Sequence, residues 1–238
     1  MYSDVESHVV RRISAAAIIE EPFPHCVIDG IFPEHLYESI IDFWPQEPAW
    51  RPLGESGRVS KDSYAERKVV LMTEQDLARL DPERRQFWQQ QIAPWLIGPS
   101  LRTALLAKFR DELARSGFAA AAEQTMGDAL IVSDRTNYAI GPHTDAPHRV
   151  VSLLFYLPED ATFRRFGTSL YVPKDRAFRC AGGPHHAFDK FYRGRTIEFV
   201  PNRLVVFPKS DHCFHGVERV DLQGIERRLL IFNVRRSS

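Results

Sequence analysis

The hydrophobic positions in the first half of the chain recur mostly at helical spacing. Pro33 suits the first turn of a helix, and apolar residues follow it at near-helical intervals. A helix start at Asp81 precedes an apolar stripe that ends at Leu96, and a second stripe predicts a helix over residues 100–115. These aromatic and leucine stripes indicate core packing. Residues 22–29, which are entered through two prolines, are instead predicted to form a short strand.

From about Ala129 the pattern changes to short apolar runs separated by Pro, Gly and Asp. These runs predict strands at Ala129–Ser133, Val150–Leu157, Thr168–Val172, Thr196–Phe199, Leu204–Phe207, Phe214–Val220 and Leu229–Val234. Short strands broken by turn residues are typical of an antiparallel sandwich or barrel. Residues 173–195, rich in Gly, His and Phe, are predicted to be a long insertion between strands, of the kind that often covers a site.

The two patterns together predict one α+β, β-dominated domain over residues 1–238. In this prediction residues 1–128 supply mixed helical support and residues 129–238 form the β-core. A hydrophobic content of 44% is sufficient to bury a sizeable core.

Composition narrows the class of protein further. Lys plus Arg and Asp plus Glu number 31 each, so no overall charge attracts the protein to nucleic acid or to an anionic membrane. Cys26, Cys180 and Cys213 include no CxxC pair, which argues against a disulfide framework and favours a reducing compartment. The apolar run at residues 13–19 is shorter than a signal peptide needs, and no run approaches the roughly 18 apolar residues of a membrane span. We therefore expect a cytoplasmic protein.

His143, Asp145 and His215 form the pattern that carries chemistry. In an extended segment, side chains two residues apart point to the same face, so His143 and Asp145 would present an imidazole and a carboxylate to one point. His215 lies near the start of another predicted strand, and an adjacent strand could bring it to the same place. Two imidazoles and one carboxylate on one face of an octahedron are the ligand set of non-haem Fe(II) oxygenases. Zinc accepts the same ligands and is the rival ion.

Arg227 and Arg228 follow His215 closely in the sequence, at the start of the last predicted strand. A dicarboxylate that chelates iron through its keto acid end needs a cation at its far end, and a buried arginine supplies one as a bidentate clamp. Neighbouring residues on a strand point to opposite faces, so only one of the two can face the metal. The spacing favours Arg227.

These motifs resemble the 2-oxoglutarate/Fe(II) dioxygenase superfamily, and within it the prolyl-4-hydroxylase-like members. The resemblance covers His143-Thr-Asp145, residues 151–158, 167–171 and 202–207, His215-Gly-Val217, Arg227 and the strand at 22–29. It implies a double-stranded β-helix (jelly roll) with supporting helices, in which His143, Asp145 and His215 bind the metal. The sequence departs from the family at Leu229, where a Ser or another small polar residue often follows the arginine by two positions.

The resemblance also implies an activity and its cofactors. These are Fe(II), 2-oxoglutarate and O2, with ascorbate as an accessory, and the products include succinate and CO2. Asp145 favours hydroxylation over halogenation, because related halogenases have a small residue in its place. Tyr138 and Thr168 are further candidates for hydrogen bonds to 2-oxoglutarate. Tyr138 lies five residues before His143, so it reaches the site only if the strand bends.

Three functions remain open at this stage. The leading hypothesis is hydroxylation of an unactivated C–H in a small molecule, an amino acid or a biosynthetic intermediate, with neither nucleic acid nor membrane as partner. The second is hydroxylation of a protein side chain, and the third is a non-catalytic metal-binding jelly-roll module. His148, His185, His186 and His212 are expected not to bind the metal. The polar segment 54–64, with Arg58 and Lys61, is expected to be a solvated loop.

Overall fold

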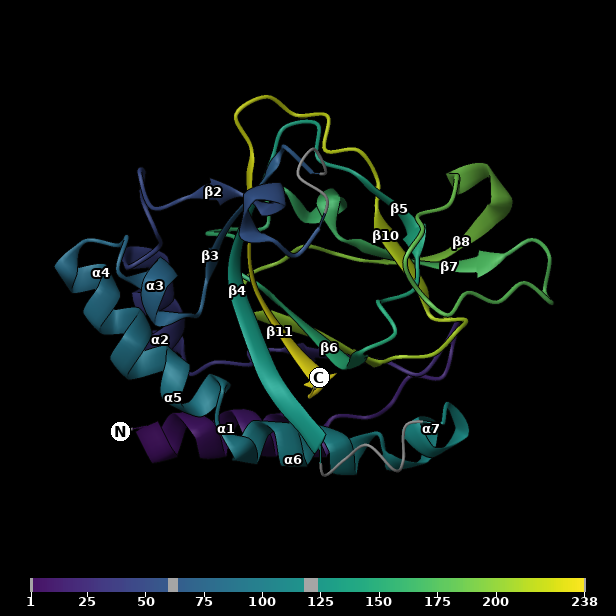
Figure 1. The fold of residues 1–238 in the computed structure, drawn as a ribbon, viewed down its shortest axis with the longest axis horizontal. Helices are drawn as coiled ribbons and strands as arrows, with labels where there is room; N and C mark the ends of the chain where they lie inside the picture. Colours follow the sequence, from purple (N-terminus) through teal and green to yellow (C-terminus); the bar gives the residue numbers. More distant parts are fainter. Residues whose placement is uncertain (1, 60–63, 118–123, 238) are drawn as a thin grey trace.

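Two antiparallel sheets face each other in this protein, and helices cover the outer face of the larger sheet (Figure 1). The computed structural model describes residues 2–59, 64–117 and 124–237. The larger sheet has the order β1-β9-β6-β11-β4-β3-β2, and the smaller has the order β5-β10-β7-β8. The predicted α+β architecture, with antiparallel sheets and supporting helices, is confirmed. No helix within these described ranges is long and apolar enough to cross a membrane.

The strands of the larger sheet come from both halves of the chain. They are β1 (Cys26–Asp29), β2 (Arg51–Pro52), β3 (Arg67–Leu71), β4 (Thr125–Arg135), β6 (Arg149–Tyr156), β9 (Arg203–Pro208) and β11 (Glu226–Arg236). The strands of the smaller sheet are β5 (Ile140–His143), β7 (Thr168–Pro173), β8 (Phe191–Ile197) and β10 (Phe214–Val217). The strand predicted at residues 22–29 is confirmed as β1, whereas β2 and β3 were not predicted.

The helices lie together along one side of the larger sheet (Figure 1). They are α1 (Tyr2–Ala15), α2 (Glu34–Asp42), α3 (Glu74–Leu77), α4 (Pro82–Phe87), α5 (Ala93–Leu96), α6 (Pro99–Lys108) and α7 (Arg110–Arg115), with a π-helical segment at Trp88–Ile92. Short 3₁₀ turns occupy Leu53–Ser56, Arg164–Phe166 and Phe188–Lys190.

The predicted helix starts are confirmed, but one predicted helix is wrong in extent. The side chain of Asp81 accepts a hydrogen bond from the backbone N–H of Arg84 at 3.0 Å, and it caps α4 as the sequence suggests. The helix predicted over residues 100–115 is instead split into α6 and α7 at Phe109. That residue is fully buried and leaves helical geometry, with φ −105° and ψ 23°. Packing of its ring against the core overrides the continuous stripe.

The predicted insertion at residues 173–195 is also too long. Its last part is β8, which begins at Phe191 and pairs with β7, so the loop between them ends at Lys190. The strand was missed there because only its two ends, Phe191 and Ile197, are buried, and the residues between them carry no apolar alternation. Thr196–Phe199, predicted as a strand, is only partly so.

The central strand β11 shows how the fold separates core from site. Leu230, Phe232 and Val234 point to the helices and belong to the larger hydrophobic core. Leu229 and Ile231 point the other way, into the space between the two sheets. Because side chains alternate along a strand, one sequence supplies a dry helix-packing face and a cavity-lining face.

Candidate metal centre

The strands β5 and β10 lie side by side and bring three ligand-type residues together. His143 ends β5, Asp145 follows two residues later, and His215 on β10 is the register partner of His143. One ligand atom from each of the three residues lies within 4.8 Å of the others. The structure therefore gathers the predicted His143, Asp145 and His215 as one cluster.

Backbone carbonyls fix the orientation of both imidazoles. The Nδ1 of His143 lies 2.9 Å from the carbonyl oxygen of Gly141, and the Nδ1 of His215 lies 3.1 Å from that of Cys213. A carbonyl only accepts, so each Nδ1 carries the proton and each Nε2 keeps a free lone pair. Burial, with a contribution from His215, lowers the pKa of His143 to about 3. Burial also lowers the pKa of His215, so both rings are neutral at neutral pH and suited to bind a metal.

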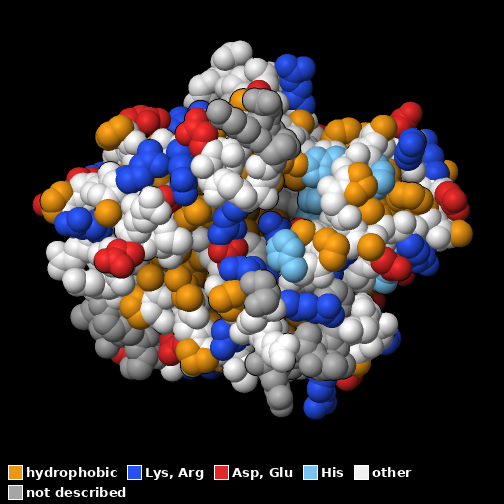
Figure 2. Space-filling model, viewed as in Figure 1, with side chains coloured by type: hydrophobic (Ala, Val, Ile, Leu, Met, Phe, Trp, Pro, Cys, Tyr) orange, Lys and Arg blue, Asp and Glu red, His pale blue; other side chains and the backbone are white. Residues whose placement is uncertain are grey.

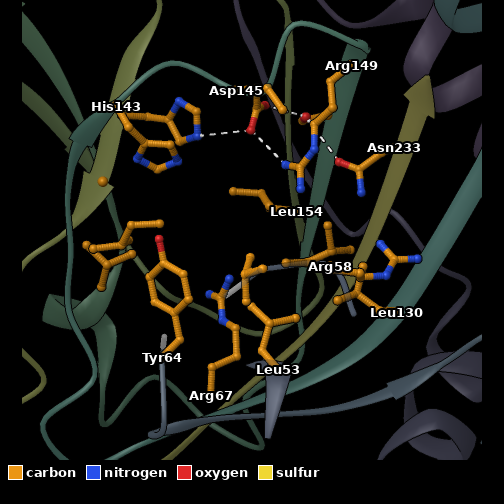
Figure 3. A pocket seen from close by; sticks show the side chains of 18 of the residues that line it. Leu53, Arg58, Tyr64, Arg67, Leu130, His143, Asp145, Arg149, Leu154 and Asn233 are labelled. Carbon is orange, nitrogen blue, oxygen red and sulfur yellow. Dashed lines mark hydrogen bonds and ion pairs between the residues drawn. The ribbon is translucent and has the colours of Figure 1, made fainter. Parts of the chain in front are cut away.

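Asp145 is a buried carboxylate that stays charged. Burial alone would raise its pKa, but the guanidinium of Arg149 and the hydrogen bond from Ser152 help to hold that pKa below its usual range. An Nη1 of Arg149 lies 2.7 Å from Oδ1 (Figure 3), and the hydroxyl of Ser152 donates to Oδ2 at 2.6 Å. These contacts fix the carboxylate in place, with Oδ1 3.9 Å from the Nε2 of His215.

The loop that follows β7 packs directly against the ligand-bearing segment. The hydroxyl of Thr144 donates to the carbonyl of Cys180 at 2.8 Å, and the backbone N–H of His186 donates to the carbonyl of Pro142 at 2.9 Å. Gly182 has a φ of +120°, and a Cβ there would overlap the backbone oxygen of Asp145. Only glycine allows this approach of loop to ligand strand.

A cavity of about 550 Å³ opens beside the cluster, between the two sheets. Its size is typical of small-molecule sites. Figure 2 shows a hollow on this face, with histidine side chains at its edge and Lys or Arg side chains next to them. Cavity-lining side chains come from the ligand cluster, from the inner face of the larger sheet and from the loops.

Arg227 is buried at one end of this cavity. Its Nε donates to the carbonyl of Phe166 at 2.7 Å, one Nη lies 2.8 Å from Asp134, and the other lies 3.3 Å from the hydroxyl of Thr168. Arg67 on β3 makes a bidentate pair with the same carboxylate, at 2.6 and 3.0 Å. Two guanidiniums share one carboxylate, so this end keeps one excess positive charge.

Tyr138 lines the same end and has an unsatisfied hydroxyl. Its side chain is fully buried, and its OH has no hydrogen-bond partner among the described residues. Burial raises the pKa of this phenol above its usual value, so the group stays protonated and can donate. The bend that the sequence required precedes it, at Asn137, with a φ of +73°. A buried hydroxyl without a partner is uncommon, and it is an observation that points to a bound ligand.

Arg228 faces the opposite side of β11 and does not line the cavity. It pairs with Glu159 at 2.7 Å and with Glu226 at 2.9 Å, and it lies over the ring of Trp44. Of the two predicted arginines, only Arg227 therefore faces the cluster.

The other histidines differ in position. His148 and His185 line the cavity, and the ring centroids of His185 and His143 are 4.7 Å apart. The hydroxyl of Tyr64 lies 2.7 Å from the Nε2 of His185. Within the described part of the chain, neither joins the ligand cluster, and neither do His186 and His212.

Several site residues were not predicted from the sequence. Asp134, Arg67, Arg149, Ser152 and Asn233 all lie in or against the cavity. One signal was available, because Asp134 is a charged residue at the end of an apolar run, at a position that the alternation of β4 places inside. The strand pairing that joins it to Arg67 had no sequence signal.

Comparison with solved structures shows a shared fold. A prolyl-4-hydroxylase from Pseudomonas putida is 17% identical, with a TM-score of 0.52 over 98% of this chain and 100% of that chain. A prolyl hydroxylase from Trichoplax adhaerens, solved with a peptide fragment of the hypoxia inducible factor oxygen degradation domain, is 12% identical. Its TM-score is 0.51 over 97% of this chain and 89% of that chain. This chain has the fold of those enzymes. No protein-family model matches the sequence, and the search of curated proteins finds no match.

Proposed function

We propose that this protein is an Fe(II)- and 2-oxoglutarate-dependent oxygenase that hydroxylates a small molecule. The observation that carries the proposal is the cluster of His143, Asp145 and His215 beside a cavity with a buried, positively charged end at Arg227. In this proposal the two sheets are the halves of a double-stranded β-helix, as in the enzymes that share the fold.

The donor set fits iron(II). Two neutral imidazoles and one carboxylate are the ligands of non-haem Fe(II) sites, and they leave adjacent positions open for a chelating cosubstrate. Zinc accepts the same three residues, but a zinc site gives no reason for a buried arginine at a fixed place across the cavity. The excess charge at Arg227 supports a dianionic cosubstrate and therefore favours iron.

The far carboxylate of 2-oxoglutarate would bind at the arginine end. Arg227 offers its guanidinium, Thr168 orients that guanidinium at 3.3 Å, and Tyr138 offers a hydroxyl that has no other partner in the described part of the chain. Iron(II) with 2-oxoglutarate and O2 supplies the oxidising chemistry, and succinate and CO2 are released. The protein orients the cosubstrate and excludes water from the buried end.

The shape of the site supports a small substrate. The cavity is about 550 Å³ and is lined from both sheets, which suits a metabolite better than an extended chain. Hydroxylation of a protein side chain is the alternative, and the peptide held by the Trichoplax adhaerens enzyme is the observation that favours it.

Anaerobic titration with Fe(II) and 2-oxoglutarate tests the proposal. We expect a weak visible charge-transfer band in the wild-type protein and no band in His143→Ala. Arg227→Gln should weaken 2-oxoglutarate binding about tenfold or more, because a charge-assisted hydrogen bond is lost. Arg228→Gln is the matched control, one residue away on the opposite face, and it should bind 2-oxoglutarate like the wild type. Tyr138→Phe keeps the packing and should also weaken binding.

Two results would contradict the proposal. A folded wild-type protein that binds neither iron nor 2-oxoglutarate would refute the oxygenase proposal and favour a non-catalytic or zinc-binding role. Equal effects of Arg227→Gln and Arg228→Gln on 2-oxoglutarate binding would move the cosubstrate away from the buried arginine. Circular dichroism of each variant separates loss of binding from loss of fold.

A further inference from the structure

A second group of arginines lies at the opposite end of the cavity from Arg227. Along β11, Arg235 is eight positions beyond Arg227, and both residues line the cavity. At about 3.3 Å per residue the two are roughly 26 Å apart along the strand. Asp145 lies between these ends, because its contact Ser152 is the register partner of Asn233. The cavity is thus positively charged on both sides of the metal ligands.

Arg235 and Arg149 are direct neighbours across the strand pair β11–β6. They are register partners at an irregularity of the ladder, and both line the cavity. Arg149 uses one nitrogen for Asp145, and no hydrogen bond or ion pair joins the guanidinium of Arg235 to any residue that the structure describes. Two like charges opposite each other are unfavourable in the free protein. An anion placed between them would remove that repulsion.

Asn233 provides a second, independent sign of a ligand at this end. Its side chain is 1% exposed and lines the cavity, and its Nδ2 has no partner among the described residues. Its Oδ1 lies 3.2 Å from the hydroxyl of Ser152, which also lies 2.6 Å from Asp145. That hydroxyl has one proton, so one polar atom of the Asn233 amide lacks a protein partner whichever way the amide is turned. Figure 3 shows this amide beside Arg149.

The charges of the whole cavity point in the same direction. The arginines in its lining are Arg58, Arg67, Arg149, Arg227 and Arg235. The carboxylates in or against the lining, within the described ranges, are Asp128, Asp134 and Asp145. Lys209 also lies against the lining, because its Nζ donates to the hydroxyl of Thr144 at 3.1 Å. Five guanidiniums and one ammonium against three carboxylates leave a net charge of +3. Iron(II) and the dianion 2-oxoglutarate cancel each other, so the loaded cavity would keep this excess for its substrate.

We propose that the substrate is a small anion whose carboxylate or phosphate ester binds between Arg149 and Arg235. This inference rests on the proposed oxygenase function. Because Arg149 also contacts Asp145, the anionic group would lie close to the metal, and the oxidised C–H would be a few bonds away from it. Planar guanidiniums bind either oxyanion in a bidentate manner. The free amide atom of Asn233 would contact a polar group next to the anion.

Calorimetry on the protein loaded with Mn(II) and 2-oxoglutarate tests the inference without knowledge of the natural substrate. The probes are two matched pairs: isobutyrate with isobutyramide, and glycerol 3-phosphate with glycerol. At least one anion should bind about tenfold more tightly than its neutral counterpart. The pair that shows the difference separates a carboxylate from a phosphate. Equal binding within both pairs, or no binding of either anion, would overturn the inference.

Two variants locate the anion. Arg235→Gln should weaken binding of the preferred anion about tenfold and leave binding of 2-oxoglutarate unchanged. Arg193→Gln is the control, because Arg193 pairs with Glu218 on the exposed face of β8 and does not line the cavity. An Arg235→Gln variant that loses 2-oxoglutarate affinity would assign this end to the cosubstrate and overturn the inference. Failure of the first titration, with Mn(II) and 2-oxoglutarate alone, would instead refute the oxygenase proposal.

Discussion

At the residue scale, the site depends on polar groups that are buried in a defined state. His143 and His215 each donate to a backbone carbonyl two residues earlier, at Gly141 and Cys213. This local contact orients a ring without help from a distant side chain. Asp145 differs, because its contacts come from Arg149 and Ser152 on β6. The two imidazoles are therefore set locally, and the carboxylate is set by a neighbouring strand.

A histidine outside the site gives a prediction about pH. His25 is fully buried, donates to the carbonyl of Phe23 at 2.8 Å, and has a pKa lowered by burial and by Arg195. Below about pH 6.5 the unfolded chain binds a proton at His25, whereas the folded chain, in which the pKa of His25 is lower, does not. The free energy of unfolding therefore falls as the pH decreases. This residue contributes at most about 1.4 kcal/mol per pH unit.

Denaturant unfolding of metal-free protein at several pH values between 7 and 5 checks this. His25→Gln should lose stability less steeply than the wild type as the pH falls. His35→Gln, the same replacement at an exposed position of α2, is the control for the substitution itself. Identical slopes for His25→Gln and the wild type would show that the folded and unfolded chains protonate His25 equally, and would contradict the lowered pKa.

At the scale of elements, the loop between β7 and β8 decides how firmly the ligand strand is held. The loop touches the ligand-bearing segment through Thr144, Pro142 and the backbone of Asp145. β5 has only four residues, and among the described strands it pairs with β10 alone, so it depends on this loop for its second side. The glycines of the loop are therefore structural parts of the metal centre.

Gly182 and Gly183 make a matched pair for a test. Their φ angles are +120° and +114°, so alanine is strained at both, at a cost on the order of 1–3 kcal/mol. Only at Gly182 would the new Cβ overlap the backbone oxygen of Asp145, whereas nothing lies within 4 Å of it at Gly183. We expect Gly182→Ala to lower Mn(II) affinity about tenfold, and Gly183→Ala to leave it near the wild-type value. Equal Mn(II) affinity of the two variants, measured by electron paramagnetic resonance, would contradict this role of the loop.

At the scale of the whole molecule, the larger sheet separates stability from function. Its outer face and the helices form one hydrophobic core, and its inner face lines the cavity. Phe32 and Phe155 stack across the outer interface, with ring centroids 5.1 Å apart. Substitutions on the two faces should therefore have different consequences.

Phe232→Ala tests this separation. Phe232 is fully buried on the outer face of β11, and its truncation should lower the free energy of unfolding by about 3–5 kcal/mol. Mn(II) affinity of the folded fraction should stay unchanged, because the side chain points away from the cavity. The neighbouring Ile231 faces the cavity, and Ile231→Val should lower the free energy of unfolding by only about 1 kcal/mol. Loss of Mn(II) affinity in Phe232→Ala at a temperature where it is folded would show that the two faces are coupled.

The sequence by itself determined the local parts of this protein. The spacing of His143 and Asp145, the cap at Asp81 and the alternation of β11 depend on neighbours in the chain, and residue pattern reports such contacts directly. The adjacent arginines Arg227 and Arg228 were predicted to point to opposite faces for the same reason, and they do.

Only the tertiary structure decided which distant residues meet. Arg67 and Asp134 face each other because β3 pairs with β4, and Arg149 and Arg235 because β6 pairs with β11 at an irregular point of the ladder. Such pairings depend on strand register and on the closure of long loops, which involve residues far apart in the chain. The pattern within one segment therefore does not predict them. The charge at each end of the cavity is therefore a property of the fold.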